Sequence, residues 1–274
     1  MRAEVEIRLD CEKQQIQAWL DEKLIGRVTV EPVSFDWGRG TVLPMGGISG
    51  VGTDEEYRRR GIARRMIAKA VEFSREQGYP VGGVSTGCGN TARRLYAGSG
   101  YVHLFSVDQY EKPVGRPEPA RPPDGVLIRP YVPGDSRHQT RTVEGLVEFG
   151  CQRRDGCVFQ VAILDLPDLL DRLQPLYVER LRSSHLDSWP SALRVEMGEQ
   201  AAEIELPAGN AGGRIEISGP YETLVRVLCG RCSAWQEYLR GHLRIAGNPG
   251  GDHGPVLNAI LGRYPWFHPQ RDRW

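Results

Sequence analysis

The chain has 274 residues, of which 40% are hydrophobic, enough to bury a sizeable core and, at this length, to form two domains. Lysine plus arginine and aspartate plus glutamate are balanced at 35 each, so no net charge draws the chain to nucleic acid or to an anionic membrane. Six cysteines are too few for a disulfide scaffold. With no signal peptide at the start and no apolar run of membrane-spanning length, we expect a cytoplasmic protein.

Alternating apolar residues dominate the first fifty positions and predict antiparallel strands joined by polar turns. The apolar members form three groups: Val5, Ile7 and Leu9; Ile16, Ala18 and Leu20; and Leu24, Ile25, Val28, Val30 and Val33. A turn at residues 37–40 leads into a further strand that ends at Thr53.

Residues 59–77 predict an amphipathic helix that Gly78 and Pro80 end. Its apolar stripe consists of Ile62, Met66, Ile67, Ala70 and Val71. A short strand at residues 81–85 follows, then a helix capped by Asn90 and a strand over residues 101–110. These elements place a first domain at residues 1–111.

Residues 112–125 contain five prolines and predict a stiff, extended linker. Residues 126–164 are expected to form short connecting strands, at 126–128 and 158–164. Residues 165–274 predict a second domain, a small α+β layer fold, with a long helix at 166–186 that Pro175 kinks. Its other predicted elements are strands at 192–196, 202–206, 214–218 and 242–246, and helices at 221–228, 234–239 and 256–262.

The segment Arg58-Arg59-Arg60-Gly61-Ile62-Ala63 carries the clearest chemical signal. It follows a strand end and opens a helix, where the first backbone N–H groups lack partners and the helix dipole is positive. Gly61 lets a phosphate approach the backbone, and the arginines, Arg64 included, supply fork-shaped cationic donors. The segment therefore predicts a pyrophosphate site.

The pattern Arg58-x-x-Gly61-x-Ala63 resembles the acetyl-CoA motif of the GNAT superfamily of N-acetyltransferases. The longer stretch of residues 48–65 resembles its Eis branch, the enhanced intracellular survival proteins. The resemblance implies an α/β (α+β) fold, with a mixed sheet flanked by helices, and acetyl-CoA as co-substrate without a metal. The implied acetyl-CoA contacts are Val51, Gly52, Thr53, Arg58, Arg59, Arg60, Gly61, Ile62, Ala63, Arg64, Asn90 and Thr91.

Residues 90–101 resemble the family pattern Asn-x-x-Ala-x-x-x-Tyr-x-x-x-Gly-Phe/Tyr, with one residue of slack. The resemblance implies that Tyr96 donates a proton to the CoA sulfur. A phenol with a pKa near 10 is suited to protonating a thiolate with a pKa near 8.5. A packing role on a helix face is the alternative for Tyr96.

The general base is not evident, because residues 41–53 contain no acid and many GNAT enzymes use a glutamate on this central strand. Eis-type proteins are similar to one another in using the C-terminal carboxylate. That resemblance makes the chain-end carboxylate of Trp274 the candidate base, with His103, Glu31 or a bound water as the alternatives. GNAT domains also usually place two helices between their first two strands, and here only about ten residues are available.

Residues 217–224 and 239–247 resemble the sterol-carrier-like domain that closes Eis-type proteins. We expect a scaffold that presents the tail, although an apolar lipid tunnel is open from sequence. Four thiols could bind zinc or act in redox chemistry: those of the Cys-x-x-Cys pair Cys229 and Cys232, and those of Cys151 and Cys157. We expect ordinary reduced thiols and no metal.

These features predict an acetyl-CoA-dependent N-acetyltransferase acting on a primary amine of a small molecule or a lysine side chain. The alternative is a non-enzymatic lipid-binding or acyl-CoA-sensing protein. No nucleic-acid or membrane partner is expected. The sequence leaves open the acceptor, the acyl group and the oligomeric state, a homo-oligomer included.

Overall fold

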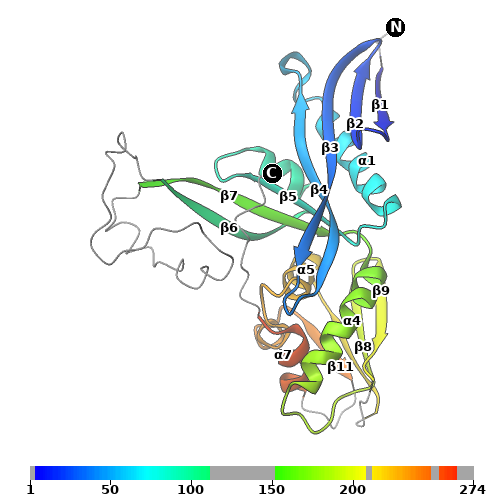
Figure 1. The fold of residues 1–274 in the computed structure, drawn as a ribbon, viewed down its shortest axis with the longest axis vertical. Helices are drawn as coiled ribbons and strands as arrows, with labels where there is room; N and C mark the ends of the chain where they lie inside the picture. Colours follow the sequence, from blue (N-terminus) through cyan, green and yellow to red (C-terminus); the bar gives the residue numbers. More distant parts are fainter. Residues whose placement is uncertain (1–3, 112–151, 208–211, 248–252, 264–274) are drawn as a thin grey trace, which may run out of the picture.

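A computed structural model describes residues 4–111, 152–207, 212–247 and 253–263. Figure 1 shows two parts, a large twisted sheet with helices against it and a smaller unit packed at one end of that sheet. No helix within these residues is long and apolar enough to cross a membrane.

The first part is built on a seven-stranded mixed sheet. Its strands are β1 (Val5–Asp10), β2 (Gln15–Leu20), β3 (Lys23–Asp36), β4 (Val42–Thr53), β5 (Val81–Gly87), β6 (Val102–Glu111) and β7 (Gln152–Ile163). They lie in the order β1-β2-β3-β4-β5-β7-β6. The β4–β5 pair is parallel, and the other neighbouring pairs are antiparallel. This arrangement confirms the predicted mixed sheet.

Two helices, α1 (Ile62–Glu76) and α2 (Ala92–Ala97), cover one face of this sheet. The predicted stripe of α1 is confirmed, because Ile62, Met66, Ile67 and Ala70 are buried against it and Val71 is partly buried. The helix begins three residues later than predicted. Arg59 and Gly61 both have positive φ angles, which an α-helix does not accept.

The sheet continues beyond residue 111, where the first domain was expected to end. The segment 152–163 was expected among connecting strands outside that domain, but it forms β7, inserted between β5 and β6. The apolar alternation of residues 158–164 marks a strand without identifying its partners. The predicted linker at 112–125 and the predicted strand at 126–128 lie outside the described residues.

The second part contains a four-stranded sheet with the order β11-β10-β8-β9. Its strands are β8 (Ala192–Met197), β9 (Gln200–Glu205), β10 (Arg214–Ser218) and β11 (Arg244–Gly247). Its helices are α4 (Leu166–Arg182), α5 (Tyr221–Leu228), α6 (Ala234–Leu239) and α7 (His253–Leu261). A small α+β unit was predicted, and the structure has these elements in the predicted order.

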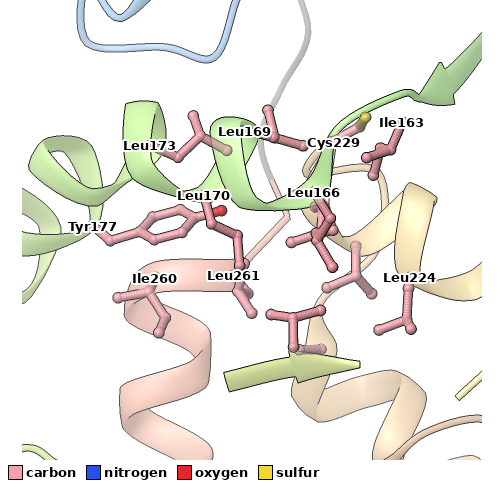
Figure 2. Packing of buried hydrophobic residues seen from close by; sticks show 14 of the residues in the cluster. Ile163, Leu166, Leu169, Leu170, Leu173, Tyr177, Leu224, Cys229, Ile260 and Leu261 are labelled. Atoms are coloured by element: carbon pink, nitrogen blue, oxygen red, sulfur yellow. The ribbon is translucent and has the colours of Figure 1, made fainter. Parts of the chain in front are cut away.

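Helix α4 follows β7 directly, since Asp165 caps it by accepting a hydrogen bond from the Asp168 backbone N–H at 2.9 Å. The helix was predicted to reach residue 186, but it ends at Arg182, and Pro175 lies inside it. Its apolar side is buried against α5, α7 and the end of β7, as Figure 2 shows for Leu166, Leu170 and Ile260.

The two parts share one hydrophobic cluster. It includes Met45, Val81 and Phe159 from the large sheet together with Leu169 and Leu224 from the smaller unit. Polar contacts add to it, because Trp37 Nε1 donates to the Leu228 carbonyl oxygen at 3.1 Å. The second part therefore covers the sheet face that α1 and α2 leave free, at one end of that face.

Candidate active site

The parallel strands β4 and β5 separate partway along their length. They pair only over Met45–Ile48 and Val81–Val84, yet β4 continues to Thr53 and β5 to Gly87. Beyond this point their facing edges have no strand partner within the described chain. The carboxyl ends of parallel strands are where open α/β sheets bind ligands.

A β-bulge in β4 lies at the point of separation. Ser49 is opposite Thr29 and Gly52 is opposite Arg27, so Gly50 and Val51 together face a single residue of β3. Gly50 has a φ of +57°, a conformation that glycine adopts without a steric penalty. Such a bulge bends its strand, which explains why β4 leaves β5 here.

The turn that follows β4 ends in an uncapped helix N-terminus. After Thr53, a 3₁₀ helix (η1, Glu55–Tyr57) leads to Arg58 and then to Gly61, the N-cap of α1, whose φ is +75°. The first α1 hydrogen bond is donated by Arg65 N–H to the Gly61 carbonyl oxygen. No side chain caps the helix, so its first N–H groups point outward from an exposed turn.

The arginines of this turn divide into two kinds. Arg58 Nε donates to the Thr53 carbonyl oxygen at 3.1 Å, and Arg60 donates to the Glu56 carbonyl oxygen at 3.0 Å. These two side chains support the loop itself. Arg59 and Arg64 are exposed beside the helix start. The turn thus combines free backbone donors with exposed guanidinium groups, a combination that suits an anionic pyrophosphate.

Tyr96 lies in α2 and is only 5% exposed. It belongs to the buried cluster that contains Ile48 and Val84, the last paired residues of β4 and β5, and its ring meets that of Tyr101 edge-on at 6.3 Å. Burial raises the pKa of the Tyr96 phenol, so the hydroxyl is protonated at neutral pH. The structure therefore places a protonated phenol in the same buried cluster as the last paired residues of β4 and β5.

The predicted contacts Asn90 and Thr91 lie at the start of α2. Asn90 Oδ1 accepts from the Ala92 N–H at 2.9 Å, as a capping residue does. Both residues line a groove of about 740 Å³ that also reaches His103 and Gln160, and its lining includes none of residues 58–64. The predicted contacts Val51, Gly52 and Thr53 lie on β4 beyond its last pair with β5.

An acid does lie near the point of separation, although β4 carries none. Glu31 of β3 is opposite Gly47 of β4, and its carboxylate accepts a hydrogen bond from the Ser49 hydroxyl. His103, another alternative base, lies on β6 with β5 and β7 between it and β4. Trp274 lies outside the described residues.

The cysteines show no metal cluster where the chain is described, since no three His, Cys, Asp or Glu side chains gather there in a way that could hold an ion. Cys229 is fully buried, and burial raises the pKa of its thiol to about 12. Cys11, Cys88, Cys157 and Cys232 are also free thiols, and Cys151 lies outside the described residues.

Comparisons with known proteins agree with this geometry. The family model described as Acetyltransferase (GNAT) domain matches residues 5–101, and no curated protein matches the chain. A GCN5-related N-acetyltransferase from Anabaena variabilis is 14% identical with a TM-score of 0.53, covering 92% of this chain and 88% of its own. Eis1 from Mycobacterium abscessus is 13% identical with a TM-score of 0.51, covering 93% and 90%.

A protein from Enterococcus faecalis, described as a probable N-acyltransferase, is 11% identical with a TM-score of 0.52 and covers 92% of this chain and 88% of its own. At such identities these likenesses show the fold alone. The chain has a GNAT-like fold, and its residues 5–101 match the GNAT acetyltransferase domain family.

Proposed function

We propose that the protein is an acetyl-CoA-dependent N-acetyltransferase that acts on a primary amine of a small molecule or a lysine side chain. The observation that carries this proposal is the separation of β4 from β5, together with the uncapped α1 N-terminus that follows β4 and the buried Tyr96. When bound, acetyl-CoA would supply the acetyl group as an activated thioester.

The residues of the turn fit the anionic end of this co-substrate. The first N–H groups of α1 have no partner inside the helix, and a side chain at Gly61 would extend into open space where a phosphate can approach. Arg59 and Arg64 would add positive charge there. The segment of Val51, Gly52 and Thr53, which lies beyond the last pair of β4 with β5, would bind the extended arm that follows the pyrophosphate.

Tyr96 is proposed as the general acid that protonates the departing thiolate. Its raised pKa keeps the proton on the phenol until a stronger base forms beside it. Protonation of the sulfur makes departure of the thiol favourable, and the surrounding apolar cluster keeps water away from the proton transfer.

The chain-end carboxylate of Trp274 is proposed as the general base that receives the amine proton. Its support is the resemblance to Eis-type proteins and the lack of an acid on β4. A carboxylate with a pKa near 3.5 is a weak base in water, so this role requires burial that raises the pKa or a bridging water.

The second part is proposed to be a sterol-carrier-like scaffold rather than a lipid carrier. Its apolar residues are buried against the large sheet and against one another in the shared cluster. A scaffold in this place would hold the C-terminal segment near the large sheet.

The test is calorimetric titration of acetyl-CoA into the purified chain, followed by assay of CoA release with a panel of primary amines. Binding with one-to-one stoichiometry and amine-dependent CoA release are expected. Absence of acetyl-CoA binding would contradict the proposal. Stoichiometric lipid in the purified protein, without transfer to any amine, would favour a lipid-binding or acyl-CoA-sensing protein instead.

A further inference from the structure

The large sheet has two faces near the separation of β4 and β5, and they differ in their side chains. A Cβ at Gly46 would meet Ser74 of α1, so Gly46 points to the helix-covered face and Gly47 to the other. A Cβ at Gly83 would meet Met45 and Phe159, which belong to the cluster shared with the second part. Gly47 and Gly83 therefore lie on the face opposite α1, and Met45 and Phe159 fill the space above Gly83.

This opposite face is not covered by helices between β1 and β2. Residues 11–14 join those strands directly, in the place where GNAT domains usually have two helices and where the sequence left too few residues for both. Along β2 and β3 the face carries polar groups, linked by hydrogen bonds from Trp19 to Gln17, from Gln17 to Gln15 and from Gln15 to Thr29, and Arg27 lies opposite Gln17. The face is therefore polar and partly open to solvent.

Glu31 lies where this face meets the separated strands. It is half-buried, it is opposite Gly47 in register, and Ser49, which donates to its carboxylate, is the residue after the last β4–β5 pair. None of the ion pairs among the described residues includes Glu31, although salt bridges are present elsewhere on the same sheet. A half-buried carboxylate without a cationic neighbour favours a positively charged ligand.

We propose that Glu31 binds the ammonium group of the acceptor amine and positions its nitrogen over the β4–β5 separation. Ser49 holds the carboxylate in its orientation through the hydrogen bond that it donates. The inference rests on the proposed acetyl transfer and names the residue that selects its acceptor. A cationic amine is the class of substrate that this site takes, and Glu31 acts as a binding and positioning residue.

The experiment compares wild-type protein with Glu31→Gln, which keeps the shape of the side chain and removes its charge. Spermidine, a cationic primary amine, is titrated calorimetrically into the protein saturated with CoA, and acetyl-CoA affinity is measured separately. Glu31→Gln is expected to weaken spermidine binding about 10-fold or more with unchanged acetyl-CoA affinity. Ser49→Ala is expected to weaken spermidine binding by a smaller factor, because it releases the carboxylate from its orientation.

Glu216→Gln is the matched control, because Glu216 is a half-buried glutamate on a strand of the second sheet. Equal spermidine affinity in wild type and Glu31→Gln would overturn the inference, and so would equally weak binding to both proteins. If Glu31→Gln fails to fold, equal spermidine affinity in wild type and Ser49→Ala would overturn it in the same way. If wild-type protein does not bind acetyl-CoA, the proposed function itself is contradicted. Failure of the proposed function is thus distinguishable from failure of the Glu31 inference.

Discussion

Ile48 of β4 and Val84 of β5 form the last pair between the parallel strands at the centre of the large sheet. Both side chains belong to the buried cluster that contains Tyr96, and the bulge at Gly50 and Val51 follows immediately. The candidate acid therefore belongs to the same buried cluster as the residues at which the strands separate. This shared cluster is the basis of the second prediction.

Gly61→Glu should reduce acetyl-CoA affinity by about 100-fold or more, because its carboxylate would repel a pyrophosphate at the α1 N-terminus. The positive φ at this position adds a strain of about 1–2 kcal/mol for any side chain. Gly40→Glu is the control, since Gly40 has a φ of +78°, has open space around it and lies in a turn before β4. Calorimetry that finds equal acetyl-CoA affinity in Gly61→Glu and Gly40→Glu would refute the phosphate site.

Tyr96→Phe removes the proposed acid and little volume. Turnover should fall by about 10²–10³, with little change in acetyl-CoA affinity. Tyr101→Phe is the matched control, because Tyr101 is a neighbouring buried tyrosine whose hydroxyl has no hydrogen-bond partner among the described residues. Steady-state rates over pH 6–9 distinguish a general acid from a packing residue. Unchanged turnover in Tyr96→Phe would mean that Tyr96 contributes to packing only.

A short peptide added after Trp274 moves the chain-end carboxylate away without changing the described fold. If that carboxylate is the base, turnover should fall strongly while acetyl-CoA affinity is unchanged. The same peptide at the N-terminus should be harmless. Full activity of the C-terminally extended protein would exclude the carboxylate and direct the search for a base to Glu31.

Arg180→Met should lower the free energy of unfolding by about 3 kcal/mol, because hydrogen bonds from a charged donor contribute about 1.5–3 kcal/mol each. Arg180 is buried and donates to the Ile260 carbonyl oxygen at 2.8 Å and to the Trp37 carbonyl oxygen at 3.0 Å, joining α4, α7 and the large sheet. Arg182→Met, at an exposed position on the same helix, is the control. Equal urea midpoints and slopes for the two variants would contradict this contribution.

Cys229 should resist alkylation in the native protein, because the thiolate is the reactive form and a thiol with a pKa of about 12 ionises to about one part in ten thousand at pH 8. Cys11 is exposed and should react readily. Peptide mapping after brief iodoacetamide treatment measures both sites. Rapid native labelling of Cys229 would point to a redox role for the Cys229–Cys232 pair, and denatured protein should label at both.

The tertiary structure also corrected where the first domain ends. Residues 158–164 alternate in the manner of a strand whatever that strand pairs with, so their pattern did not distinguish a connector from a central strand of the large sheet. Pairing of β7 with β5 and β6 depends on residues far away in sequence. The register that places Glu31 opposite Gly47 could not be predicted from the sequence for the same reason. The lack of an acid on β4 indicated only that a carboxylate near the site would belong to another element.

The sequence by itself determined the elements whose signals are local. Alternation at Ile16, Ala18 and Leu20 identified a strand with one buried face, and the stripe from Ile62 to Ala70 identified α1. Such signals are local because each residue's φ and ψ preferences and the side-chain period act over a few positions. Strand order, the bulge at Gly50 and the burial of Tyr96 were decided by tertiary structure, because they follow from which distant apolar faces pack together.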